Sequence, residues 1–352
     1  MPPDAAQPAP RLADTAARRA VAVFRRHPEL LPFLAMVALA AWNAVFTPNF
    51  AHFEVRDGRL YGSMVDILQN GAPVMLLAIG MTLVIALAGI DLSVGSVMAL
   101  AGTVAALLLE SGGCSGPVAI AGALAVAALV GAFNGVMVTF VGLQPIIATL
   151  VLLVAGRGIA LTLTGDQKIQ LTSSAFEWLR TGGWLALPSP IYVSLGVAAV
   201  VLVVLRKTAL GLYIEAIGGN ARAARLAGLP VHTVRLVAYT FSGVCAGLAG
   251  VLATAKINEA DVANCGLYLE LDAILAVVIG GTSLTGGRAR LVGALCGAVI
   301  MQTLTVMLQM HNVKTEHTLI VKALVALAVC LIQTPAFAEF LRRAARRPVR
   351  AA

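Results

Sequence analysis

The sequence predicts an all-α protein that crosses a membrane about ten times. Composition, hydropathy and the placement of charge all support that prediction. Of the 352 residues, 59% are hydrophobic and only 12% are charged, whereas soluble domains are roughly half apolar and a quarter charged. The mean hydropathy is +0.90. Because a soluble protein of this length would still need a polar surface, we expect lipid to surround the chain.

Ten apolar runs are long enough, or nearly so, to form membrane-spanning helices. A helix needs about 20 mostly apolar residues to cross the bilayer core, and no run shows the alternation of membrane-barrel strands. The 34 glycines suit helices that pack closely in lipid. The third, sixth and eighth runs are short or interrupted by glycine, which predicts broken central helices. The predicted spans are 30–47, 66–89, 94–110, 117–141, 145–164, 190–205, 233–254, 271–284, 291–310 and 318–336.

Basic residues predict how these spans are oriented, because Lys and Arg gather in cytoplasmic loops. Of the 25 Lys and Arg residues, five lie in 1–29, five in 206–235, two near 285–290 and five in 337–352. Ten spans place all four segments on one side. We therefore expect a basic cytoplasmic segment at 1–29, a transmembrane domain at 30–336 with a cytoplasmic loop at 206–235, and a basic cytoplasmic tail at 337–352.

Several function classes lack their sequence signatures. The formal charge is +8, but the basic residues lie in short clusters between apolar runs, so we expect no nucleic-acid partner. The five cysteines follow no metal-ligand spacing, although Cys114 and Cys265 fall in predicted outer loops where a disulfide is one alternative. No Walker A, HExxH, GxSxG or CxxC pattern occurs. The sequence therefore predicts a chain that is not an enzyme and binds no cofactor or metal.

Three long segments carry a family resemblance. They are AIGMTLVIALAGIDLSVGS at 78–96, GGNARAARLAGL at 218–229 and ELDAILAVVIGGTSLTGG at 270–287. In that order they resemble the ribose-type family of permease subunits from bacterial ABC importers, and the resemblance covers about residues 60–335. Within the family, residues 57–86 and 268–281 look most similar to a galactofuranose permease.

The resemblance implies a multi-pass subunit of the bacterial inner membrane that passes a monosaccharide. Two permease subunits, identical or sibling chains, would form the path. A separate cytoplasmic ABC ATPase would hydrolyse the ATP, and a periplasmic sugar-binding protein would deliver the substrate.

The loop 206–235 contains a short predicted helix. Asn220 suits an N-cap, and Gly228 suits its end. Arg222 and Arg225 are three residues apart and so share a face. The resemblance implies that this helix couples the permease to its ATPase. The alternative is that the arginines only anchor the neighbouring span to anionic lipid headgroups.

Asp91 is the most unusual residue of the apolar runs. A charge at mid-bilayer costs about 2.5–3.5 kcal/mol on insertion scales. The predicted spans place Asp91 near the cytoplasmic end of the second span, where it could cap the third span beyond Ser93. The alternative is that its carboxylate meets sugar hydroxyls or a gating partner.

Other polar residues in or beside the predicted spans are candidates for the substrate path. Pro73 removes a backbone donor and could break its helix, which draws attention to the neighbouring Asn70. Hydrogen bonds between helices are an equal alternative for each candidate. The complete set of path candidates is Asn70, Asp91, Ser93, Asn134, Gln144, Asp272 and Thr282.

Two other transport functions compete with a sugar importer. An ion-coupled secondary transporter would use Asp91 and Asp272 as proton carriers. A branched-chain amino-acid permease would share the architecture, but a zwitterion calls for charge complementarity along the path. Dependence of uptake on a separate ATPase distinguishes the first rival from an ABC importer.

Overall fold

The computed structural model describes residues 29–47, 50, 52–56, 59–184 and 186–333. The predicted cytoplasmic tail 337–352, most of the segment 1–29 and the last residues of the tenth predicted span lie outside these residues.

The described chain is almost entirely helical, with three short two-stranded sheets. The antiparallel pairs join β1 with β2, β3 with β6 and β4 with β5. The elements are α2 (Leu30–Phe46), β1 (Glu54–Arg56), β2 (Arg59–Tyr61), α3 (Ser63–Ala86), α4 (Val94–Glu110), α5 (Gly116–Val136), η1 (Met137–Val141), α6 (Pro145–Thr164), β3 (Ile169–Gln170), α7 (Ser174–Thr181), β4 (Gly183–Trp184), β5 (Leu187–Pro188), α8 (Ser189–Lys207), α9 (Ala209–Gly219), α10 (Ala221–Leu226), α11 (Val231–Ile257), β6 (Glu259–Ala260), α12 (Leu269–Ile279), α13 (Leu291–Met310) and α14 (Thr315–Gln333).

The all-α membrane class is confirmed. Within the described residues, α3, α5 with η1, α6, α8, α11 and α13 are long and apolar enough to cross a membrane. Each of the ten predicted spans overlaps a described helix. The eighth is shorter than expected, because α12 has 11 residues and therefore extends only about 16 Å, roughly half of the bilayer core.

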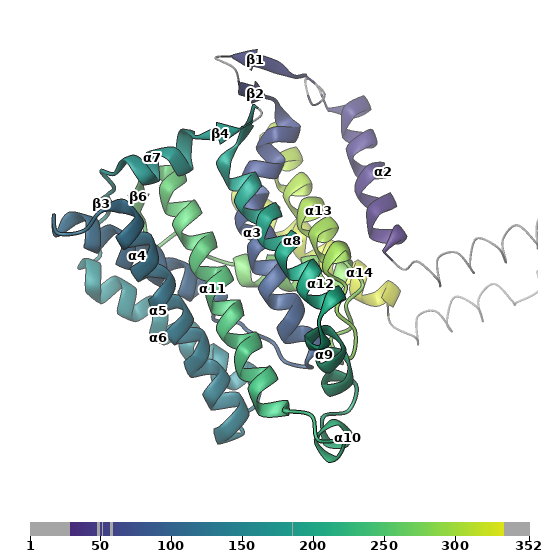
Figure 1. The fold of residues 1–352 in the computed structure, drawn as a ribbon. Helices are drawn as coiled ribbons and strands as arrows, with labels where there is room; N and C mark the ends of the chain where they lie inside the picture. The colour runs from purple at the N-terminus through teal and green to yellow at the C-terminus, as the bar shows by residue number, and fades with distance from the viewer. Residues whose placement is uncertain (1–28, 48–49, 51, 57–58, 185, 334–352) are drawn as a thin grey trace, which may run out of the picture.

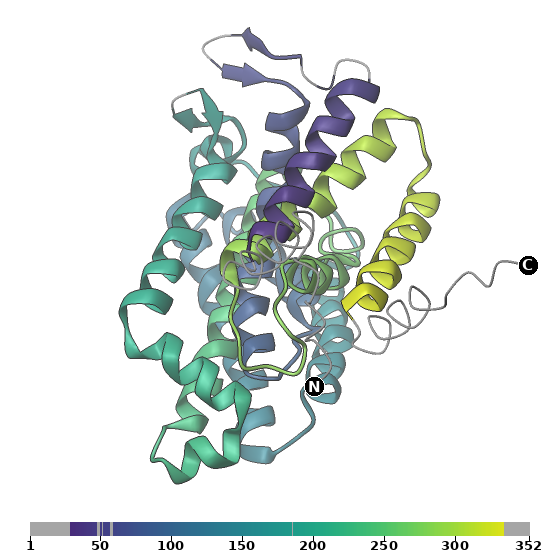
Figure 2. The same cartoon turned by 90° about the vertical axis from the view of Figure 1, so that its right-hand side faces the viewer.

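The helices form a bundle with two distinct ends (Figure 1). The β1–β2 hairpin and α7 lie at one end, which we call the hairpin end, and α9 and α10 lie at the other. α11 packs against α3, α4 and α5. The helices α2 and α14 lie at the periphery (Figure 2). The loops that the basic residues assign to opposite sides thus separate in space.

Small residues bring the central helices close together. At the crossing of α5 and α11, a Cβ added to Gly243 would lie 2.4 Å from the carbonyl oxygen of Ala127. A Cβ on Gly80 of α3 would lie 2.9 Å from the Cα of Ser242 on α11. Backbones this close leave no room for larger side chains. The close approach lets the helices pack favourably against each other in lipid.

The chain between α3 and α4 is a break within the bundle. Pro73 does not break α3, contrary to expectation, because the helix runs through it from Ser63 to Ala86. The helix ends where Ala88 takes a left-handed conformation with φ of 60°. α4 then begins at Val94 and runs beside the second half of α11, so a Cβ on Gly250 would lie 2.2 Å from the carbonyl oxygen of Met98. The start of α4 is therefore inside the bundle rather than at its surface.

Candidate functional site

Asp91 is the centre of a buried polar cluster in the break between α3 and α4. Its side chain is only 1% exposed. One carboxylate oxygen accepts hydrogen bonds from the Ser93 hydroxyl at 2.6 Å and the Ser93 backbone N–H at 3.1 Å. The other accepts from the Ser242 hydroxyl of α11 at 2.8 Å. Asn134 of α5 donates to the Ser93 hydroxyl at 2.8 Å. These four residues form the Asp91 cluster.

The Asp91 cluster ties the broken segment to two neighbouring helices. Both carboxylate oxygens accept hydrogen bonds, from Ser93 on one side and from Ser242 of α11 on the other. Asp91 fixes the turn at Ser93, the residue before α4, and α4 has no side-chain cap there. Ser242 is the twelfth residue of the 27-residue α11. The structure thus places Asp91 deeper in the bundle than the expected position near a span end.

The remaining path candidates lie apart from the Asp91 cluster. Gln144 is exposed just before α6. Thr282 is buried and accepts a hydrogen bond from the Arg290 backbone at 3.2 Å. Asp272 of α12 forms an ion pair with Lys322 of α14 at 2.6 Å. Each of these residues has a local structural partner or open surroundings, and the structure brings none of them together into one site.

The short helix expected in the cytoplasmic loop is present as α10. The side-chain oxygen of Asn220 accepts from the backbone N–H groups of Arg222 at 3.1 Å and Ala223 at 3.0 Å, so Asn220 is the N-cap. Gly228 follows the helix in a left-handed conformation with φ of 82°. Arg222 and Arg225 are exposed, and Leu226 between them and Gly228 is 85% exposed. α10 thus presents charge and one large apolar side chain at the end of the bundle.

A cleft opens near the hairpin end, and its mostly apolar walls carry several polar side chains, among them Asn70. Its volume is about 300 Å³. The walls come from α3, α11, α13 and the loop 258–268. Lys256, in the last turn of α11, donates a hydrogen bond to the side-chain oxygen of Asn70. We call this the polar cleft, and its polar lining residues are Gln69, Asn70, Lys256, Asp261, Asn264 and Gln302.

A second, smaller pocket adjoins the polar cleft. It has a volume of about 110 Å³ and is lined by Arg59, Asp66 and Arg180, together with Gln69, which also lines the cleft. We call it the hairpin pocket. Asp66, Gln69 and Asn70 are three and four residues apart on α3, so they share one face of the helix. One polar stripe of α3 therefore runs from the hairpin pocket into the polar cleft.

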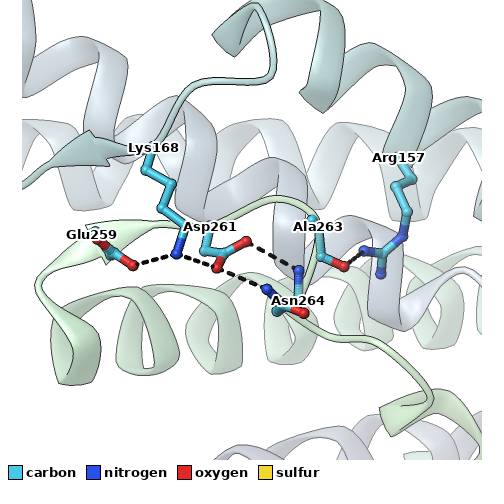
Figure 3. Close-up of polar contacts among 6 residues, drawn as sticks. All are labelled: Arg157, Lys168, Glu259, Asp261, Ala263 and Asn264. Atoms are coloured by element: carbon cyan, nitrogen blue, oxygen red, sulfur yellow. Dashed lines mark hydrogen bonds and ion pairs between the residues drawn. The ribbon is translucent and has the colours of Figure 1, made fainter.

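The loop 258–268, one wall of the polar cleft, is held in place by two basic residues (Figure 3). Lys168 lies 2.9 Å from the Glu259 carboxylate and 2.8 Å from that of Asp261. Asp261 in turn accepts from the Asn264 side chain at 2.9 Å. Arg157 of α6 donates to backbone carbonyls at 262, 263 and 265, at 2.8, 3.2 and 3.1 Å. The loop is therefore fixed by α6 and by the segment that follows it.

The ion pair also sets the charges at this wall. The hydrogen bond from Lys168 holds the pKa of the Asp261 carboxyl below its usual range, with a smaller contribution from Asn264. The hydrogen bonds to Asp261 and Glu259 raise the pKa of Lys168. Asp261 is thus ionised and paired at neutral pH, so it adds little net charge to the cleft.

Sequence reasoning did not identify four of the polar cleft residues, Lys256, Asp261, Asn264 and Gln302. Lys256 lies just beyond the seventh predicted span, 233–254, and Asp261 and Asn264 lie in a loop without a motif. Gln302 lies within the apolar run 291–310, so it carried the same signal as Asn70, a polar side chain in a predicted span. The possible bridge between Cys114 and Cys265 does not form, since both cysteines are free.

Comparison with known proteins identifies the family. A family model described as a branched-chain amino acid transport system permease component matches residues 63–330. The galactofuranose transporter permease of Escherichia coli K12 is 43% identical, over 90% of this chain and 93% of its own length. The fructose import permease of Bifidobacterium longum is 41% identical, over 86% of each chain. The ribose import permease of Escherichia coli K12 is 39% identical, over 85% of this chain and 91% of its own. No solved structure was found that matches the chain.

The matched region contains the six helices of the described residues that are long and apolar enough to span a membrane. It also contains the three segments on which the resemblance to ribose-type permeases rests. The chain therefore belongs to the permease family of sugar ABC importers, within the broader family of branched-chain amino acid transport permease components.

Proposed function

We propose that this sugar importer permease carries galactofuranose or a closely related monosaccharide across the bacterial inner membrane. The observation that supports this choice is the 43% identity to a galactofuranose permease over nearly the whole chain. The polar cleft agrees with it, because amide groups such as those of Asn70 and Gln302 both donate and accept hydrogen bonds, as sugar hydroxyls do.

We further propose that the chain acts within an assembly that consists of two permeases, identical or sibling, a cytoplasmic ABC ATPase and a periplasmic sugar-binding protein. ATP would be bound and hydrolysed by the ATPase, so this chain would need no cofactor of its own. The exposed side chains of Arg222, Arg225 and Leu226 on α10 support a contact with the ATPase at this end, with Asn220 and Gly228 setting the ends of the helix.

The proposed orientation has ten spans and both termini in the cytoplasm. It is supported by the separation of the two sets of loops, since α9 and α10 lie at the end opposite the β1–β2 hairpin (Figure 1). In this orientation the polar cleft and the hairpin pocket face the periplasm. Asn70 is then the path candidate best placed to meet an incoming sugar. We assign Asp91, Ser93 and Asn134 to the support of the broken segment beside the path.

Uptake of labelled galactofuranose tests this function. Cells that carry the ATPase, the binding protein and the partner permease are compared with and without this chain. We expect uptake only with the chain present, and we expect its loss when the ATPase is inactivated. Uptake that persists without the ATPase and collapses with the proton gradient would instead establish a secondary transporter. Competition by leucine, but not by monosaccharides, would favour an amino-acid permease.

A further inference from the structure

Lys256 places an ammonium group with unused donors inside the polar cleft. Among the described residues, its hydrogen bond goes to Asn70. An ammonium has three N–H donors, so two remain for another partner. Lys256 is exposed and lines the cleft, and Leu252, Ala253 and Ile257 line the same wall. The head group is thus available to a ligand that enters the cleft.

The lining of the polar cleft carries one cationic and one anionic side chain, Lys256 and Asp261. Lys256 and Asp66 attract each other across the α3–α11 interface. Asp66 lines the hairpin pocket, whereas Asp261 lines the cleft and is paired with Lys168. An anionic ligand would compete with Asp66, and a cationic ligand would be repelled by Lys256. A neutral ligand with several hydroxyls neither competes with Asp66 nor is repelled by Lys256. Its hydroxyls can accept a hydrogen bond from the Lys256 ammonium and can both donate to and accept from the amides.

The size and the access of the cleft fit such a ligand. Its volume of about 300 Å³ lies at the lower end of the range of about 300–1,000 Å³ for small-molecule sites. Gln69 lines both the cleft and the hairpin pocket, so the two spaces share a wall on the side where a sugar would arrive.

We propose that Lys256 and Asn70 form the specificity-determining contact of this permease, which selects a neutral polyhydroxylated ligand as it passes from the hairpin pocket into the polar cleft. A hydroxyl of the ligand replaces the Asn70 oxygen as acceptor for the Lys256 ammonium, and the Asn70 amide then bonds the same ligand. The inference rests on the proposed sugar-permease function and adds to it the contact that selects the sugar.

The test measures transport selectivity in proteoliposomes that hold the complete importer. Labelled galactofuranose and its monodeoxy analogues are supplied on saturating binding protein, and the rate for each analogue is divided by the rate for the parent sugar. We expect at least one analogue to be transported about tenfold more slowly than the parent, corresponding to one lost hydrogen bond. In Lys256→Met that difference should disappear, whereas Lys256→Arg should retain part of it.

The ratio separates recognition from a structural defect. A variant that is merely less stable lowers the rates for parent and analogue equally, so the ratio does not change. Lys314→Met is the matched control, because Lys314 is an exposed lysine outside the lining of the cleft. If Lys256→Met fails to reach the membrane, the same ratio is measured in Asn70→Ser.

The possible outcomes distinguish the inference from the function on which it rests. If the unmodified importer transports no monosaccharide, the proposed function is wrong. If it transports the sugar and Lys256→Met keeps the same ratio for every analogue, the function stands and the Lys256 contact is wrong. That second result is also expected if a partner permease covers the cleft.

Discussion

The Asp91 cluster and the polar cleft both combine polar side chains of helices with those of a connecting segment, yet they differ in what those side chains contact. In the Asp91 cluster, both carboxylate oxygens accept hydrogen bonds from the protein and the side chain is 1% exposed. In the polar cleft, Lys256 has unused donors and open space before it. The hydrogen-bond partners of a polar residue in an apolar run therefore indicate its role. The residue type alone does not indicate whether the residue is structural or binds a ligand.

The comparison predicts that removal of the Asp91 carboxylate mainly harms stability. Asp91→Ala leaves the buried hydroxyls of Ser93 and Ser242 without their acceptor, and a buried polar group without a partner costs about 1–3 kcal/mol. We expect a clear drop in the melting temperature of the detergent-purified protein, and low membrane levels. Asp91→Asn, which keeps one acceptor oxygen, should be affected less.

Asn70→Ala is the matched variant in the polar cleft. It should melt within a degree or two of the unmodified chain while transport falls. If Asp91→Ala melted normally and supported normal uptake, Asp91 would have neither the structural nor the sugar-binding role.

Asp91 can lie inside the bundle only if α4 begins beside the middle of α11, and a larger residue at position 250 tests that placement of α4. Gly250→Ala places a Cβ 2.2 Å from the Met98 carbonyl oxygen, so α4 and α11 must separate, at a cost of about 1–3 kcal/mol. Thermal melting measures the loss. Gly196→Ala is the control, because nothing lies within 4 Å of the added Cβ. Equal melting of the two variants would mean that α4 does not begin beside mid-α11.

The smallest expected effect is on the loop that forms one wall of the cleft. The pKa of Asp261 is lowered by Lys168, so the pairing stabilises the loop above the ordinary Asp pKa of about 3.9. This stabilisation is lost as the pH falls through the lower pKa of the folded state. Lys168 is 57% exposed, so solvent weakens the effect. After correction for the slower intrinsic exchange of amides at acid pH, the protection of the amides in 258–268 should be lower at acid pH than at pH 7.

Lys168→Met provides the control for this prediction. The amide protection factors in 258–268 of this variant should be lower than those of the unmodified chain at pH 7 and should change less between pH 7 and pH 3. Exchange at the Asp91 cluster should not differ between the two proteins. If the amides of 258–268 exchanged equally fast with and without Lys168 at pH 7, the loop would be held by Arg157 alone.

Hydropathy and short motifs predicted the helices and the α10 cap, because both depend on residues close together in sequence. Asn220 and its N–H partners are two and three residues apart. The contact between Asp91 and Ser242 joins residues 151 positions apart, and no local pattern reports such a contact. Hydropathy also reports the length of an apolar run and not how deep each of its residues lies in the folded bundle. It therefore placed Asp91 nearer the end of the bundle than the structure does, and it overestimated the length of α12.

The polar cleft was harder to predict because its residues carry different signals. Asn70 and Gln302 are polar residues within apolar runs, but Lys256 looked like an ordinary charge beyond a span. Only the packing of α3, α11 and α13 shows that these side chains share one space.

Thiol labelling tests the central contrast between the open cleft and the closed Asp91 cluster most directly. Asn70→Cys and Ser242→Cys are each introduced into a complete importer whose chain carries Cys114→Ser and Cys265→Ser, and a membrane-impermeant thiol reagent is added from the periplasmic side. We predict that the thiol at position 70 reacts, that sugar-loaded binding protein slows its reaction, and that the thiol at 242 stays unmodified. Labelling and sugar protection at 242, with none at 70, would contradict the account.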